Sequence, residues 1–221
     1  MKILAIAPHP DDETLGCGGT LLKHKNNGDE INWLIITDIN SEEGWPKDRI
    51  KKRSNEIKQI SNFYNFSNHE NLSYPSTKMD IIPISELIEK ISKFYNKIKP
   101  EVVYMPYDHD VHTDHQIICK AVLSMIKWFR YPYINKVLMY ETLSETDFNL
   151  GQQNSFKPNT YVDISNYIDK KIKAMSIYES EIESFPFPRS KEAIKSLAML
   201  RGSQSGFNFA ESFVSIYEKI K

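Results

Sequence analysis

Short apolar runs alternate with longer amphipathic segments along the chain, and this alternation restricts the possible folds more than any other feature of the sequence. Residues 3–7 are continuously apolar and residues 31–37 largely so, as in strands buried on both faces of a parallel sheet. Residues 13–27, between them, are predicted to form a helix that stops at Gly28. The same patterns predict further helices at residues 48–64, 84–98, 115–130, 167–178 and 193–200, and further strands at residues 71–74, 102–105, 137–140 and 161–164.

Strands separated by helices indicate βαβ units and therefore a mostly parallel sheet. Because βαβ crossovers are right-handed, helices are expected on both faces, which predicts an α/β, Rossmann-like fold. The length of 221 residues suits one large domain, and we expect a single domain over residues 1–221. In such sheets ligands bind beyond the carboxyl ends of the strands, at the point where the strand order reverses.

The composition argues against several classes of function. With 28 basic and 29 acidic residues the net charge is −1, so no strong field would attract nucleic acid or an anionic membrane. No apolar stretch approaches the length of a membrane span, and the first residues lack the pattern of a signal peptide. Cys17 and Cys119 are too few for a disulfide framework or a four-cysteine zinc site. A reduced, cytoplasmic setting without membrane insertion is therefore expected.

Two clusters of histidines and carboxylates follow strands that a parallel sheet would bring together. The first runs from His9 to Glu13, directly after the strand at residues 3–7. The second covers residues 109–115, after the strand at residues 102–105, and holds three of the six histidines of the chain. If these two strands are neighbours where the strand order reverses, both clusters face one crevice. Histidine nitrogens and carboxylate oxygens that converge from two loops are the ligands of catalytic zinc.

Other interpretations of these residues stay open at this point. An acidic residue at a helix start is commonly only an N-cap or a partner of the helix dipole. The additional groups His109, Asp110 and Asp114 would suit a second metal ion, as in a two-metal phosphoesterase. A sugar- or metal-binding module without turnover would need the same pocket. Gly16, Gly18 and Gly19 lie inside the predicted helix rather than in the turn of a dinucleotide-binding loop, so we expect them to mark close packing.

At these residues the chain resembles the PIG-L/LmbE family of zinc-dependent N-deacetylases. The family motif A-H-P-D-D-E corresponds to A-P-H-P-D-D-E at residues 7–13, where Pro8 is extra, and the motif H-x-D-H corresponds to H-T-D-H at residues 112–115. The resemblance extends to the R-x-x-E helix at residues 53–56 and to Arg201-Gly202 and A-E-S-F at residues 210–213. The two motifs together are a specific signal, whereas either one alone would be weak.

The resemblance implies a metal centre and a base. His9, Asp12 and His115 would bind Zn²⁺. Asp11 would act as the general base and then as the acid that protonates the leaving amine. Both roles follow from positions that match the family motifs.

Further roles are implied for residues around the metal ligands. His112, in its protonated form, would stabilise the oxyanion, and Asp114 would orient a neighbouring histidine. Asp110 is a candidate for a second orienting group, and Arg53 is a candidate substrate contact.

The implied reaction is hydrolysis of the N-acetyl group of an amino sugar to give a free amine and acetate. The expected substrate is a small molecule of the N-acetylglucosamine type. Residues 129–133 and 138–142 resemble a bacterial branch associated with surface-polysaccharide sugars, which favours a nucleotide-linked or otherwise activated sugar. Relatives often form symmetric oligomers, and the aromatic segment at residues 207–217 is a candidate interface for a homo-oligomer.

Overall fold

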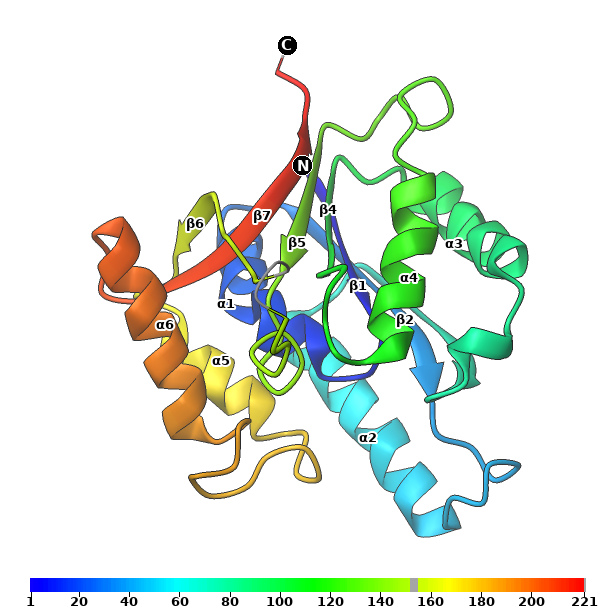
Figure 1. Ribbon diagram of the computed structural model, residues 1–221, viewed down its shortest axis with the longest axis horizontal. Coiled ribbons are helices and arrows are strands. Elements are labelled where there is room, and N and C mark those ends of the chain that lie inside the picture. Colours follow the sequence, from blue (N-terminus) through cyan, green and yellow to red (C-terminus); the bar gives the residue numbers. More distant parts are fainter. Residues whose placement is uncertain (152–154, 221) are drawn as a thin grey trace.

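A computed structural model describes residues 1–151 and 155–220 of the chain (Figure 1). Its seven strands form one sheet in the order β3-β2-β1-β4-β5-β7-β6. The strands are β1 (Lys2–Ala7), β2 (Glu30–Asp38), β3 (Asn68–Pro75), β4 (Val102–Pro106), β5 (Lys136–Tyr140), β6 (Thr160–Asp163) and β7 (Ala210–Glu218). The helices are α1 (Asp12–Asn26), α2 (Lys47–Tyr64), α3 (Ile84–Ile98), α4 (Thr113–Ser124), α5 (Ile168–Met175) and α6 (Lys191–Ser205), with a short 3₁₀ turn, η1 (Met79–Ile81).

The strand order reverses between β1 and β4. Strands β1, β2 and β3 pair in parallel toward one edge, and β4 and β5 continue in parallel from the other side of β1. Only β7 runs against its neighbours β5 and β6 in the described part of the sheet. The predicted α/β, Rossmann-like sheet is therefore confirmed, and the carboxyl ends of β1 and β4 form the crevice that such folds use for ligands.

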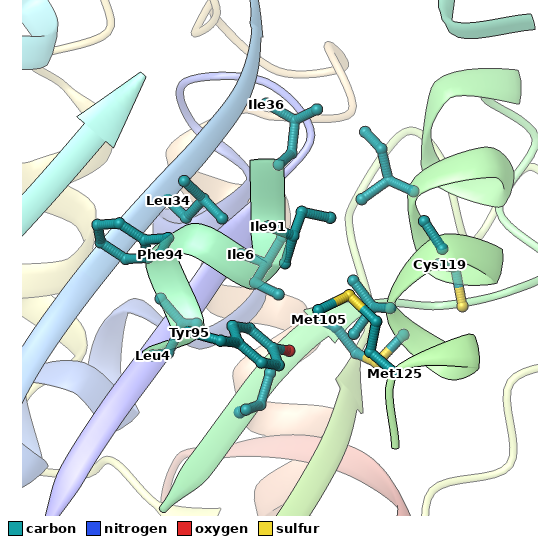
Figure 2. Packing of buried hydrophobic residues seen from close by; sticks show 14 of the residues in the cluster. Leu4, Ile6, Leu34, Ile36, Ile91, Phe94, Tyr95, Met105, Cys119 and Met125 are labelled. Atoms are coloured by element: carbon teal, nitrogen blue, oxygen red, sulfur yellow. The ribbon is translucent and has the colours of Figure 1, made fainter. Parts of the chain in front are cut away.

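Helices cover both faces of the sheet, as the right-handed crossovers require. On one face α3 and α4 pack on alternate strand residues such as Leu4, Ile6 and Leu34 (Figure 2). On the other face α1, α2 and α5 pack on the intervening residues, including Ile3 and Trp33. Among residues 1–151 and 155–220, no helix combines the length and apolar character that crossing a membrane requires.

Helix α1 packs closely against its neighbours at glycines, where a larger side chain would not fit. A Cβ at Gly16 would lie 2.2 Å from Cδ2 of Tyr140, and one at Gly19 would lie 2.8 Å from Ile164. Tyr140 cannot easily move, because its hydroxyl donates to the Ile6 carbonyl at 2.8 Å. The prediction that these glycines mark close packing is confirmed.

A buried ion pair holds α1 at a kink. The backbone at Cys17 leaves helical values (φ −143°, ψ 19°), so the amide of Gly19 and the carbonyl of Leu15 find other partners. The Glu211 carboxylate from β7 accepts the N–H of Gly19 at 2.8 Å, and the Lys171 ammonium from α5 donates to the Leu15 carbonyl at 2.7 Å. Glu211 and Lys171 pair with each other at 2.6 Å. This pair therefore fixes the direction of the first turn of α1, which carries the acidic motif.

In the C-terminal half, one predicted helix is shorter than expected, and one strand was not predicted. The helix predicted at residues 115–130 ends at Ser124, because Met125 and Tyr131 turn inward to the core while Trp128 stays 69% exposed. The segment at residues 207–217, a candidate interface for a homo-oligomer, is largely strand β7 between β5 and β6. Phe213 in that strand is fully buried, whereas Phe207 is 41% exposed, and the role of the segment in an interface stays a prediction.

Candidate metal centre

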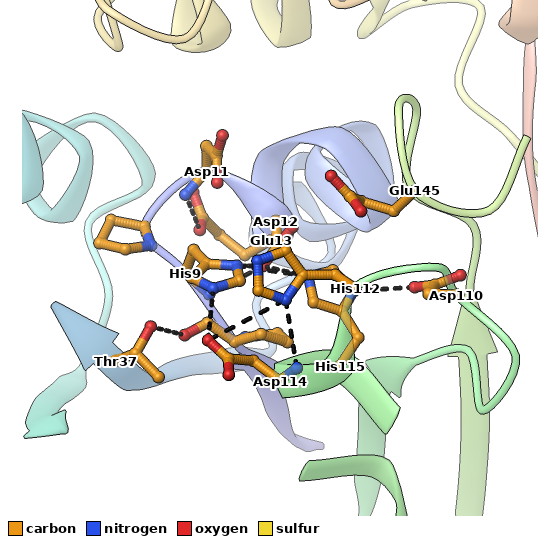
Figure 3. A network of polar contacts seen from close by, with 12 residues as sticks. His9, Asp11, Asp12, Glu13, Thr37, Asp110, His112, Asp114, His115 and Glu145 are labelled. Carbon is orange, nitrogen blue, oxygen red and sulfur yellow. Dashed lines mark hydrogen bonds and ion pairs between the residues drawn. The ribbon is translucent and has the colours of Figure 1, made fainter. Parts of the chain in front are cut away.

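The two motif loops meet at the carboxyl ends of β1 and β4 (Figure 3). His9 follows β1, Asp12 begins α1, and His115 lies in the first turn of α4. Oδ2 of Asp12 lies 3.3 Å from Nδ1 of His9 and 3.2 Å from Nε2 of His115. The same two histidine nitrogens are 3.3 Å apart. Three donor atoms from two distant segments thus form a nearly equilateral triangle.

This triangle has the dimensions of a metal site. Three ligands of a tetrahedral zinc ion, each about 2.0–2.1 Å from the metal, lie about 3.3 Å from one another. Two imidazole nitrogens and one carboxylate oxygen are also the donor types that catalytic zinc takes. The residues present therefore fit a metal ion, and His9, Asp12 and His115 form a group that could hold one.

The electrostatics of the cluster favour positive charge at its centre. Burial opposes a charge on His9, yet hydrogen bonds to Asp114 and Asp12 raise its pKa to about 9. Burial also opposes a charge on His115, and Asp12 and Asp110 nevertheless raise its pKa well above the usual range. Carboxylates that draw positive charge into a buried cluster are what a cation site requires.

His9 and His115 each contact a second carboxylate through the ring nitrogen that points away from the triangle. Nε2 of His9 lies 3.1 Å from Oδ2 of Asp114, and Nδ1 of His115 lies 2.8 Å from Oδ2 of Asp110. Such contacts leave Nδ1 of His9 and Nε2 of His115 directed at the centre of the triangle, and they fix the ring orientations. The hydroxyl of Thr146 donates to the other oxygen of Asp110 at 2.5 Å. Asp114 and Asp110 therefore have the geometry of the orienting groups predicted for them.

Asp11 has an unusual backbone and a buried carboxyl. Its φ of 143° lies in a region that non-glycine residues rarely adopt, and its N–H donates to Glu13 at 3.2 Å. Glu13 itself accepts hydroxyl hydrogens from Thr14 at 2.6 Å and Tyr178 at 2.8 Å. Burial and the neighbouring Asp12 raise the pKa of Asp11 well above its usual range. Strained residues of this kind are concentrated at functional sites, and a raised pKa suits a group that accepts and returns a proton.

His112 caps the start of α4, and its surroundings favour the neutral ring. Its Nδ1 accepts the backbone N–H of Asp114 at 3.1 Å, so the proton of the neutral ring lies on Nε2. Burial and the nearby His9 and His115 lower the pKa of His112 to about 4. These contacts favour a neutral His112 over the protonated form that the resemblance implies, because a helix N-terminus and neighbouring imidazoles both disfavour the imidazolium.

A pocket of about 300 Å³ opens beside the cluster. Arg53 lies on its wall, but its guanidinium donates to the Pro10 carbonyl at 2.7 Å and pairs with Glu181. Arg189 also reaches Glu181, at 3.3 Å, and lies 3.5 Å from Asp11. Arg53 thus supports the loop that carries the acidic motif, and its predicted contact with a substrate stays a prediction.

Sequence reasoning missed two carboxylates of this pocket. Glu181 comes from the segment between α5 and α6, and Glu145 comes from the turn after β5. No local motif marks these residues, because their place in the site depends on the packing of distant segments. Trp45, which the sequence alone makes a candidate for stacking on a sugar, lies on the loop before α2, lines the pocket and is 43% exposed.

The fold and both motif loops have counterparts in known proteins. Residues 4–126, more than half of the chain, match the family model PIG-L, described as GlcNAc-PI de-N-acetylase. The chain is 25% identical over 218 residues to the diacetylchitobiose deacetylase of Thermococcus kodakarensis, in a match that covers 95% of this chain and 81% of that protein. A conserved protein from Thermus thermophilus superposes with a TM-score of 0.79 at 27% identity, over 99% of this chain and 96% of that one.

A second solved structure shares the fold at lower identity. The N,N'-diacetylchitobiose deacetylase of Pyrococcus horikoshii superposes with a TM-score of 0.78 at 22% identity, over 98% of this chain and 84% of that one. The matched residues 4–126 include the segments that carry all three corners of the donor triangle. This chain belongs to the PIG-L family.

Proposed function

We propose that the chain is a zinc-dependent hydrolase that removes the acetyl group from the nitrogen of an N-acetylglucosamine-type sugar. The observation that carries the proposal is the triangle of His9, Asp12 and His115, with edges of 3.2–3.3 Å, beside a pocket of about 300 Å³. Membership of the PIG-L family and the deacetylase names of its relatives supply the reaction class. The three residues of the triangle are the proposed zinc ligands.

The proposed reaction divides proton transfer and charge stabilisation between two residues. A bound zinc ion would polarise the acetyl carbonyl and lower the pKa of a water molecule toward about 7. Asp11, held by Glu13 and Arg189 at the pocket wall, accepts a proton as the water attacks and returns it to the nitrogen as the C–N bond breaks. A buried carboxyl with a raised pKa is suited to both transfers.

His112 is proposed to donate from Nε2 to the oxygen that becomes negative during attack. Its neutral ring is pre-oriented, because Nδ1 is fixed by the N–H of Asp114. A neutral donor stabilises the developing charge without needing a proton from solvent. The residue lines the same pocket as Asp11.

His112→Ala is expected to lower kcat by about 10²–10³-fold, the usual cost of losing one oxyanion donor. Zinc content should stay at the wild-type level, and KM should change less than kcat, because the donor acts mainly in the transition state. Steady-state kinetics together with metal analysis check both expectations. A change confined to KM would assign His112 to substrate binding instead.

The main rival is a two-metal phosphoesterase. Within the described part of the chain, His9, His112 and Asp114 form a second group that could hold a metal. That group shares His9 with the first, and the two oxygens of Asp114 accept the backbone N–H groups of Thr77 at 2.7 Å and Met79 at 3.2 Å. These bonds favour an orienting role for Asp114 over metal binding, and thus a single ion.

A free-amine release assay tests the proposal. N-acetyl sugars, both free and nucleotide-linked, are incubated with the protein in the presence of zinc or of a chelator, and amine and acetate are measured together. We expect equal amounts of the two products, loss of activity with the chelator and recovery when zinc is returned. Absence of amine from every sugar with zinc-loaded protein, or release of phosphate from phosphoesters instead, would overturn the proposal. A binding module without turnover would show saturable binding and no product.

A further inference from the structure

The pocket contains a further carboxylate, Glu145, which the proposed reaction does not yet use. It lies in the turn that follows β5 and lines the same pocket as Asp11 and His112. In Figure 3 the carboxyl groups of Glu145 and Asp11 lie above the histidine cluster, at its right and left.

Glu145 differs from the other pocket carboxylates in its partners. Within residues 1–151 and 155–220, its side chain has one hydrogen bond, from the hydroxyl of Ser144 at 3.2 Å, and no basic side chain pairs with it. The other carboxylates of the pocket are engaged by basic side chains, histidines or N–H donors, in the pairs Asp11 with Arg189, Asp12 with His115, Glu181 with Arg53 and Asp38 with Asn71. A half-buried carboxylate that lacks a cationic partner is costly unless a ligand supplies one.

The turn holds Glu145 firmly relative to the metal centre. The N–H of Glu145 donates to the Thr142 carbonyl at 3.1 Å, and the N–H of Val111 donates to the Glu145 carbonyl at 3.2 Å. Thr146, the next residue, donates its hydroxyl to Asp110, which orients His115. The carboxylate is therefore carried by the same hydrogen-bonded scaffold that positions a proposed metal ligand, which is the arrangement of a preorganised site.

The proposed reaction produces the cation that this carboxylate lacks. Hydrolysis converts a neutral amide and one water molecule into acetate and an amine, and at neutral pH the amine takes up the acid's proton to become an ammonium. A positive charge thus appears on the nitrogen only after the C–N bond breaks. The cationic Arg189 lies beside Asp11 and compensates the charge on that side of the pocket. On the Glu145 side, a product ammonium would meet a carboxylate that has no cationic partner in the described part of the chain.

We propose that Glu145 is a catalytic residue that accepts a hydrogen bond from the reacting nitrogen and stabilises the ammonium of the amino-sugar product. This inference rests on the proposed deacetylation and adds the recognition of its product. Because hydrogen bonds to charged groups are stronger than neutral ones, the contact should bind the free amine more tightly than the N-acetyl sugar.

The test compares Glu145→Gln with the wild type on one matched pair of ligands. The pair is N-acetylglucosamine and glucosamine, free or nucleotide-linked, in whichever form the wild type hydrolyses fastest. Glutamine keeps the size of the side chain and an acceptor oxygen but removes the charge. We expect inhibition by the free amine to weaken about 10–100-fold, while KM for the N-acetyl sugar changes by less than about threefold. Zinc content should be unchanged.

Two further variants separate this role from others. Thr146→Val breaks the hydrogen bond from the turn to Asp110. It should lower kcat without selectively weakening inhibition by the free amine. Glu183→Gln removes a charge from an exposed residue outside the pocket. It should change neither the inhibition constant of the free amine nor KM for the N-acetyl sugar. Equal effects of Glu145→Gln on amine and N-acetyl sugar, no effect on either, or loss of zinc would each overturn the inference. Absence of wild-type turnover on every sugar would instead contradict the proposed function itself.

Discussion

Asp11→Asn is expected to lower kcat by about 10²–10⁴-fold, the range that a general acid–base group contributes. Asparagine has nearly the same shape, so the strained backbone and the hydrogen bond to Glu13 should persist. Oδ2 of the neighbouring Asp12 takes part in the donor triangle, whereas Asp11 does not, and zinc content should therefore be unchanged. Stopped-time assays of amine release, with metal analysis of the same sample, measure both quantities.

Asp108→Asn provides the control for this change. Asp108 precedes the second cluster, its side chain is 38% exposed, and it does not line the pocket. The same loss of one negative charge there should leave kcat within about twofold, because exposed charges are screened by solvent and salt. Near-normal turnover by Asp11→Asn would exclude the base role, and loss of zinc would show that the carboxyl binds the metal.

Glu211→Ala is expected to destabilise the fold by about 3–5 kcal/mol, the usual cost of removing one partner from a buried ion pair. Glu211 and Lys171 are each 5% exposed. The substitution leaves the Lys171 ammonium buried and removes the acceptor of the Gly19 and Thr20 amides at the kink of α1. Chemical denaturation followed by circular dichroism measures the free energy of unfolding.

Glu218→Ala in the same strand is the matched control. Glu218 pairs with Lys136 at 3.1 Å, but the two side chains are 47% and 28% exposed. Exposed pairs contribute about 0–1 kcal/mol, so this variant should unfold almost as the wild type does. If Glu211→Ala were no more destabilised than Glu218→Ala, the ion pair would not be what holds the kinked helix.

The parts of the fold that the sequence predicted are those with local signals. Apolar runs such as residues 3–7 and 31–37 lie in the central strands, where both faces are buried and no polar alternation interrupts the pattern. Strand β7 escaped prediction because it carries Glu211, a charged residue that is buried only because α1 and α5 supply its partners. Burial of that kind depends on residues far away in the chain.

The same distinction separates the predicted and unpredicted parts of the site. The donor triangle follows from two compact motifs at the ends of adjacent strands, so a parallel-sheet topology was enough to bring them together. The preference of His112 for the neutral form depends on the N–H of Asp114 and on the rings of His9 and His115, and only the three-dimensional structure brings these groups together. Glu145 likewise enters the site through a turn whose position depends on Asp110.

Zinc content of the purified protein, measured for the wild type, His115→Ala and His109→Ala, tests the central claim most directly. His109 lies in the same cluster as His115, but its side chain is 42% exposed and belongs to neither candidate metal group. We predict about one zinc per chain for the wild type and for His109→Ala, and almost none for His115→Ala, because two remaining ligands hold zinc poorly. Full zinc occupancy in His115→Ala, or two zinc ions per wild-type chain, would contradict the account.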